Sequence, residues 1–311
     1  MGYFFTAFIK VFVMVIMMAV GWIAAKTGTL TEEGSKDLTK ILLNIVTPCL
    51  IVDSFLSISP GAISVGSMLQ AVIISFMAIG IAILISMMLF RREVESRKTV
   101  LRFEVIFSNA GFMGLPLVQS IVGDGGAVFA SFFVAVFNFL CWTYGYSLMN
   151  HGKKIKIWRL ICNPGTIGIA IGLPLYLLNI SLPSVLQVPL QGFSDLNTPL
   201  AMLVVGGYIA KMRVKDFLSD KNVFLAVTAR LLLAPMAFVG VLCLIRPEYD
   251  LFLSTVIQAS APSAANGALF AAMYGQDAKL ASKTVAMATL FSVVTIPIIT
   301  SLVQLLLTNI L

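Results

Sequence analysis

The sequence is poor in charged residues and in the residue types that metal sites and most catalytic sites use. Only 11% of its 311 residues are Asp, Glu, Lys or Arg, whereas soluble domains carry about 25%. Histidine occurs once, at His151, and the four cysteines form no C-x-x-C pair. So few charges could not cover a globule of this size, which excludes an ordinary soluble protein. We therefore expect no metal, haem or disulfide framework, and no resident cofactor.

Hydrophobic residues make up 59% of the chain and gather in long apolar segments. A helix needs about 20 mostly apolar residues to cross a bilayer while satisfying its own backbone hydrogen bonds. Ten segments meet this requirement, at 4–25, 38–56, 66–90, 101–122, 127–149, 161–179, 189–210, 223–245, 251–274 and 284–307. We expect an all-α polytopic membrane protein with ten transmembrane helices, the first of them an uncleaved span.

Positive charge is concentrated on one side of the expected membrane. Eighteen of the 21 basic residues lie in or beside the odd-numbered loops, and Arg246 alone lies in an even-numbered loop. By the positive-inside rule the odd-numbered loops are cytoplasmic and both termini are outside. The net charge of +7 then reflects orientation in a bacterial inner membrane, and no nucleic-acid partner is expected.

The two halves of the chain carry similar interruptions. Thr47-Pro48 in the second span and Thr198-Pro199 in the seventh span lie 151 residues apart, close to half of the chain. Five spans in each half would make the second half enter the membrane from the opposite face. This pattern predicts two inverted repeats, 1–150 and 151–311, an architecture typical of secondary transporters.

The fourth and ninth spans contain helix breakers near their middles. Proline removes a backbone donor, and glycine lowers the cost of leaving the helical conformation. Unwound backbone at that depth is tolerated only where it is buried in protein or lines a wet cavity. Asn side chains and half-helix N-termini would favour an anion there. The alternative is a pair of kinked helices whose small residues allow close packing. The candidate site residues in these spans are Asn109, Gly111, Pro116, Pro262, Ser263 and Asn266.

The Thr-Pro pairs of the second and seventh spans are a second set of candidates. Thr47, Pro48, Thr198 and Pro199 either line the same substrate site or form ordinary proline kinks. The sequence leaves both alternatives open.

Three of the charged residues inside expected spans are candidates for a role in transport, because ionisable groups are costly in the membrane and usually serve a function there. Arg230 acts at the site, snorkels to the interface, or pairs with an acid such as Glu104. Asp53 and Glu104 are the acids best placed for proton coupling, unless each lies close enough to an interface to be solvated. Coupling to either H⁺ or Na⁺ stays open.

The sequence resembles the auxin efflux carrier family, within the bile acid/sodium symporter-like superfamily. Residues 109–116 match the family segment N-x-G-F-x-G-x-P, residues 261–275 resemble its second crossover, and Asn163-Pro164 resembles the opening of its sixth span. The resemblance implies that spans four and nine cross at their breaks. It also implies a scaffold (4–56 and 161–210) and a moving core (66–149 and 223–307). If the residues that match the family's motifs have the same role here, Asn109, Pro116, Pro262 and Asn266 would surround the substrate.

The resemblance implies a secondary active transporter for a small organic anion, a carboxylate such as malate or an auxin-like acid, working by an elevator-type mechanism. An enzyme is not expected, because paired acids or a nucleophile with a base are missing. A channel or pore-forming subunit, and a membrane sensor without transport, are the alternatives. Besides its substrate we expect membrane lipid as a partner, and a homodimer stays open.

Overall fold

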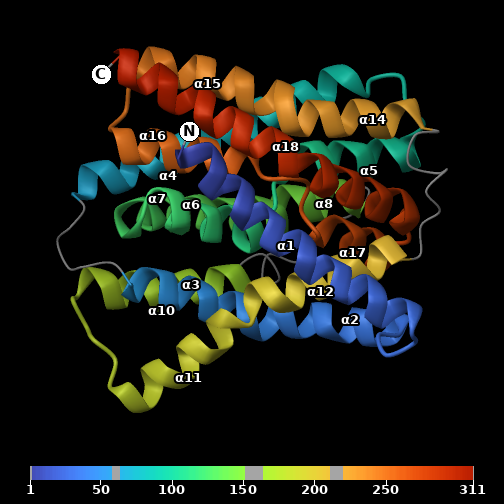
Figure 1. Ribbon diagram of the computed structural model, residues 1–311, viewed down its shortest axis with the longest axis horizontal. Coiled ribbons are helices and arrows are strands. Elements are labelled where there is room, and N and C mark those ends of the chain that lie inside the picture. Colours follow the sequence, from blue (N-terminus) through green and yellow to red (C-terminus); the bar gives the residue numbers. More distant parts are fainter. Residues whose placement is uncertain (1, 58–63, 151–163, 211–219, 311) are drawn as a thin grey trace.

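The structure, a computed structural model, describes residues 2–57, 64–150, 164–210 and 220–310, and these residues form a bundle of helices (Figure 1). The only strand pairing in these ranges is one isolated bridge, so the predicted all-α class is confirmed. The helical elements, with π-helical turns marked η, are α1 (Gly2–Lys26), α2 (Glu32–Ile41), η1 (Leu42–Val46), α3 (Thr47–Leu56), α4 (Val65–Leu89), α5 (Glu95–Ile106), η2 (Ala110–Gly114), α6 (Leu115–Ile121), α7 (Asp124–Leu140), η3 (Cys141–Gly145), α8 (Tyr146–Met149), α10 (Pro164–Leu177), α11 (Ser184–Asp195), α12 (Asn197–Ala210), α14 (Lys221–Thr228), η4 (Ala229–Leu233), α15 (Ala234–Ile245), α16 (Tyr249–Ser260), α17 (Asn266–Met273) and α18 (Ala278–Ile310).

Several of these helices are suited to a membrane. Within the described ranges, five continuous helical stretches are long and apolar enough to cross one: Glu32–Leu56, Val65–Leu89, Gly125–Met149, Lys221–Ile245 and Ala278–Leu307. Shorter apolar helices occur at Val11–Lys26, Ala110–Ile121 and Thr166–Leu177. The chain is thus helical in each segment where a span was predicted, while the ten-span topology and the inverted orientation of the halves stay predictions.

The seventh predicted span, 189–210, is wrong at its start. Its first residues belong to α11, which contains Pro189 and ends before Leu196, and a separate helix, α12, begins at Asn197. The side chain of Asn197 is buried, and its Nδ2 donates to the carbonyl of Gly111 at 3.2 Å. This tertiary hydrogen bond lies at the start of α12. The hydropathy of the sequence alone cannot predict it.

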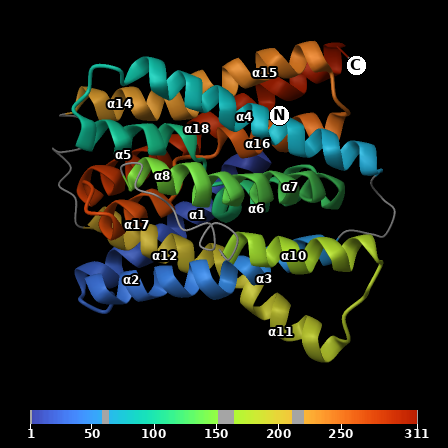
Figure 2. The same ribbon diagram turned by 180° about the vertical axis from the view of Figure 1, so that it is seen from behind.

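The helices form two groups that lie on opposite edges of the bundle (Figures 1 and 2). One edge carries α2, α3, α10, α11 and α12, and the other carries α4, α5, α14, α15 and α18, with α6, α7 and α8 between them. The closest packing between helices far apart in the sequence is that of α1 on α12 and of α10 on α3. The division into a scaffold and a moving core stays a prediction.

The contact between α1 and α12 depends on two glycines. A methyl group at Gly21 would overlap the backbone of Leu203, and one at Gly206 would overlap the backbone of Met18 and Trp22. Membrane helices commonly associate through such close backbone contacts, because the hydrophobic effect does not drive helices together in lipid.

A polar cluster joins the two halves at one end of the bundle. Arg97 of α5 donates to Glu93 at 3.2 Å and to Asp220, while Asn222 donates to Glu93. Asp220 also caps α14 by accepting from the backbone N–H groups of Asn222 and Val223. Burial alone would raise the pKa of the Asp220 carboxyl, but the hydrogen bonds and the charge of Arg97 outweigh it and hold this pKa below its ordinary value.

The glycine contact predicts the effect of a single methyl group. Gly206→Ala should destabilise the protein by about 1–3 kcal/mol, because the added carbon meets backbone atoms that cannot move aside. Gly80→Ala is the matched control, since no atom lies within 4 Å of a methyl group there, and alanine in a helix is favoured over glycine by about 1 kcal/mol. Thermal unfolding in detergent measures both, and equal melting temperatures for the two variants would contradict this packing.

Candidate functional site

Both predicted interruptions are present, and they meet. The chain leaves the helical conformation over residues 107–109, between α5 and η2, and over residues 261–265, between α16 and α17. Ser108 and Ser263 form the antiparallel bridge at the point where the two segments cross. Each interruption therefore separates its predicted span into two half-helices whose inner ends lie together.

The crossing segments satisfy each other's backbone. The N–H of Asn109 donates to the carbonyl of Pro262 at 2.6 Å, and the N–H of Ala264 donates to the carbonyl of Phe107 at 2.9 Å. These bonds replace helical hydrogen bonds that both segments have lost. Without them, non-helical backbone at this depth would leave polar groups buried and unpaired.

The first interruption lies earlier than its glycines and proline suggest. Gly111 and Gly114 lie in the π-helical turn η2, and Pro116 lies in the first turn of α6, where its missing N–H costs little. The N–H of Gly114 donates to the carbonyl of Asn109 at 3.0 Å, the spacing of a π-turn. Gly114 also leaves room for the side chain of Gln258.

Arg230 binds the C-terminal ends of two half-helices. Its guanidinium donates to the carbonyls of Val105 (2.9 Å) and Ile106 (3.2 Å) at the end of α5, and to the carbonyl of Ala259 near the end of α16. Helix C-termini carry partial negative charge, which a cation between them offsets. The side chain is only 3% exposed. Arg230 thus does not snorkel, and the described ion pairs do not join it to Glu104.

The N-terminal ends of the other two half-helices, η2 and α17, border a small cavity, which we name the crossover cavity. Its lining residues are Thr47, Leu50, Asn109, Gly111, Phe112, Val134, Phe137, Asn138, Ala264, Ala265 and Asn266. Its volume of about 20 Å³ has room for about one water molecule.

Amide groups dominate the polar chemistry of the crossover cavity. Asn109, Asn138 and Asn266 are each at most 5% exposed, and none of the described lining residues is charged. The Nδ2 group of Asn109 is a buried donor with no partner in the described part of the chain. Buried donors without partners are rare, and here the unused donor belongs to a residue that lines the cavity. The site can therefore donate hydrogen bonds without carrying a net charge.

A second, larger cavity lies beside the first, and we name it the vestibule. Leu50 lines both cavities. The vestibule has a volume of about 250 Å³ and is lined by Leu50, Asp53, Ser54, Ser57, Leu115, Pro116, Gln119, Ala127, Ser131, Gln191, Ser194, Asp195, Asn197 and Thr198. The predicted site residues therefore divide between the cavities, with Asp53, Pro116 and Thr198 in the vestibule and Thr47, Asn109, Gly111 and Asn266 at the crossing.

The remaining candidates line neither cavity. Pro48 and Pro199 lie in the first turns of α3 and α12. Pro262 contributes its carbonyl to the crossing, and the hydroxyl of Ser263 donates to the backbone carbonyl of Glu104 at 2.9 Å. Glu104 itself is fully buried beside the crossing.

The sequence interpretation missed Asn138 and Asn197. Asn138 contributes an amide to the crossover cavity, and Asn197 ties α12 to the carbonyl of Gly111. Asn138 stands among apolar residues, so a search for isolated amides inside predicted spans would have found it. Asn197 directly precedes the Thr-Pro pair that was noted.

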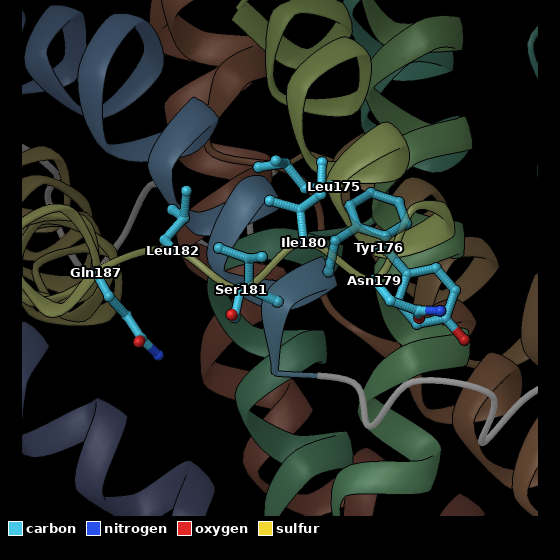
Figure 3. A pocket seen from close by; sticks show the side chains of 9 residues that line it. Leu175, Tyr176, Asn179, Ile180, Ser181, Leu182 and Gln187 are labelled. Atoms are coloured by element: carbon cyan, nitrogen blue, oxygen red, sulfur yellow. The ribbon is translucent and has the colours of Figure 1, made fainter.

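A third pocket lies away from the crossing, where the ends of α3 and α10 meet the start of α11. Figure 3 shows the residues around it, among them Tyr176, Asn179 and Gln187. Its volume is about 150 Å³, and none of the predicted site residues is among those that line it.

Comparisons with known proteins agree on the class of this chain. The family described as "Membrane transport protein" matches residues 4–300. A protein of Methanothermobacter thermautotrophicus described as "Uncharacterized transporter" is 26% identical over 291 residues, which cover 92% of this chain and 94% of that protein. Both descriptions concern transport, and neither names a substrate.

The contacts of Arg230 predict a large loss of stability on its removal. Arg230→Met should cost at least about 3 kcal/mol, because three buried carbonyls lose their donor and two helix C-termini lose a compensating charge. Arg91→Met removes an exposed arginine and is the control. Thermal unfolding of the purified variants measures the difference. A melting temperature of Arg230→Met equal to that of Arg91→Met would rule out this role.

Proposed function

Because this chain belongs to the membrane transport protein family, the auxin efflux carrier family whose motifs it carries, we propose that it is a secondary active transporter of a small organic anion. The resemblance seen in residues 109–116 is thereby confirmed. The family is one of membrane transporters rather than enzymes, and its members are integral multi-pass proteins. The substrate class and the mechanism are our inference from the site.

The chemistry of the crossover cavity supports an anionic substrate. Two helix N-termini border it, each with about half a positive charge and N–H groups that have no partner within their own helix. The unpartnered amide of Asn109 adds a further donor. A carboxylate accepts several hydrogen bonds and is therefore a suitable ligand for such a set of donors. Malate and indole-3-acetate are suitable probes, because both carry the carboxylate that this arrangement would bind.

The position of the cavities supports an elevator-type mechanism. Thr47 and Leu50 come from α3, in the range predicted for the scaffold, whereas Asn138 comes from α7 and Asn109 precedes η2, both in the range predicted for the core. Residues of the vestibule divide in the same way, with Asp53 and Thr198 in the scaffold range and Pro116 in the core range. Both cavities are therefore lined by the two groups of helices that would move against each other. A volume of about 20 Å³ is far below that of an organic acid, so binding requires the groups to separate. Rigid-body movement of one group against the other would open the cavity to each side in turn.

The first test is binding. The purified protein should be stabilised by malate or indole-3-acetate, and ligand at a hundred times its dissociation constant would add about 2.7 kcal/mol. A screen of melting temperature against these acids, with and without sodium, measures the effect. Stabilisation by neither acid at any concentration would count against an organic-anion carrier.

Transport gives the decisive prediction. Asn109→Ala should abolish saturable uptake of the stabilising acid into proteoliposomes, because the variant removes a donor from the cavity. Its fold should remain intact, since the crossing at this residue uses backbone atoms. Asn44→Ala is the matched control, because the Asn44 amide is exposed and bonds to the carbonyl of Lys40 in the preceding turn.

Other outcomes identify the rival functions. Flux through the wild type that never saturates and shows no counterflow would indicate a channel. Binding without any flux would indicate a sensor. Full saturable uptake by the folded Asn109→Ala variant would remove Asn109 from the site.

A further inference from the structure

Glu104 is a fully buried carboxyl group without partners. Its exposed fraction is 0%, and neither of its carboxylate oxygens accepts or donates a hydrogen bond within the described residues. The described ion pairs do not include it. An ionised carboxylate in such surroundings is strongly disfavoured, and burying it is tolerable only if it is paired or protonated. Glu104 therefore carries a proton in this conformation.

Among the described residues, no cation forms an ion pair with Glu104. Cys141 of η3 lies near it, and the side chain of Cys141 lies within reach of Asn266. Arg230 of η4 donates through its terminal nitrogens to the backbone carbonyls of Val105 and Ile106, directly after Glu104 in the chain, and to that of Ala259, and its Nε has no hydrogen-bond partner among the described residues. The other titratable or charged side chains on α5 and on the helices packed against it are Glu95, Arg97, Lys98, Arg102, Tyr146, Lys221, Tyr274, Lys279 and Lys283, and none of them forms a described ion pair with Glu104.

The carboxyl of Glu104 lies against the N-terminus of α17. A methyl group at Gly267, the second residue of α17, would overlap the carboxylate oxygen of Glu104. The first residue of the same helix, Asn266, lines the crossover cavity. The proposed substrate and Glu104 thus share one helix N-terminus, approached from two sides. Two negative charges at that position would repel each other with little solvent to screen them.

From this juxtaposition we propose that Glu104 is the proton-binding site that couples transport, so that one proton binds to its carboxylate for each organic anion that binds in the crossover cavity. This inference rests on the proposed function. The proton comes from solvent and forms an O–H bond on the carboxylate, which adds one positive charge and breaks no covalent bond. Protonation removes the repulsion and favours anion binding, and a bound anion favours protonation to the same extent. Anion and proton then cross together.

The same geometry disfavours sodium as the coupling ion at the crossing. Sodium would bind hard oxygen donors such as the free carbonyls at helix C-termini. At the ends of α5 and α16, the carbonyls of Val105, Ile106 and Ala259 already accept from the guanidinium of Arg230. These three carbonyls are therefore not available to a sodium ion while Arg230 binds them.

Proton uptake by the wild-type protein is the first test. At a pH high enough to ionise Glu104 in the unliganded protein, found by repeating the measurement over a series of pH values, malate or indole-3-acetate added to detergent-solubilised protein in weak buffer should cause uptake of close to one proton per bound anion. The apparent dissociation constant should rise by up to about tenfold per pH unit once the free carboxyl ionises. Binding without proton uptake, and with an affinity independent of pH across the whole series, would overturn the role of Glu104 and leave the anion site standing. Binding of neither acid at any pH would overturn both proposals.

The variant Glu104→Gln separates coupling from binding. Glutamine keeps the shape of the Glu104 side chain and cannot ionise. The variant should therefore bind the same acid without proton uptake, and its affinity should not change with pH. In proteoliposomes it should exchange internal for external substrate, yet lose the accumulation that an imposed pH gradient drives in the wild type. Retained accumulation, or retained proton uptake, would overturn the proposal.

Glu33→Gln is the matched control, because it makes the same carboxyl-to-amide change at an exposed residue of α2. It should keep both proton uptake and gradient-driven accumulation. Asp53→Asn tests the other candidate carboxyl, which lies in the vestibule, half-buried and near Ser194, and does not line the crossover cavity. Loss of proton uptake in Asp53→Asn with its retention in Glu104→Gln would assign the coupling proton to Asp53 instead. Should Glu104→Gln fail to fold, the proton uptake of the wild type still decides between the outcomes.

Discussion

The structure depends on how four broken helix ends are satisfied in the middle of an apolar bundle. Interrupting two helices releases backbone donors and acceptors where water is scarce, and each would be costly if left unpaired. The protein meets this constraint by letting the two interruptions hydrogen-bond to each other between Asn109 and Pro262 and between Phe107 and Ala264. A single interrupted helix would have no such partner, so the two interruptions are physically interdependent.

The crossing also separates charge by helix direction. The C-terminal ends of α5 and α16 converge on Arg230, and the N-terminal ends of η2 and α17 border the crossover cavity. The partial negative charge of the two helix C-termini is therefore compensated by Arg230, whereas the helix N-termini on the other side of the crossing keep hydrogen-bond donors that could bind a ligand. In the proposed function, this asymmetry would let an uncharged cavity favour an anion, and it would let the buried carboxyl of Glu104 beside α17 influence what binds there.

The sequence predicted the helical class and the two interruptions, because low charge, long apolar segments and clustered helix breakers are local features. It did not locate the first interruption more closely than residues 107–116, since Gly111 and Pro116 are tolerated in a π-turn and in a first helical turn, whereas the backbone pairing at Asn109 depends on residues far along the chain. It also left the contacts of Arg230 undecided, as no spacing rule indicates which carbonyls a buried guanidinium reaches. Asn197 and the start of α12 were missed for the same reason, because a tertiary hydrogen bond fixes them.

The vestibule has a consequence for inhibition. It has about twelve times the volume of the crossover cavity and is lined by hydroxyl, amide and carboxylate groups. A compound bound there would contact Pro116 of the predicted core and Thr198 of the predicted scaffold without resembling the substrate. If these two parts move against each other as proposed, such a compound would hold them together, and the transported acid would not compete with it.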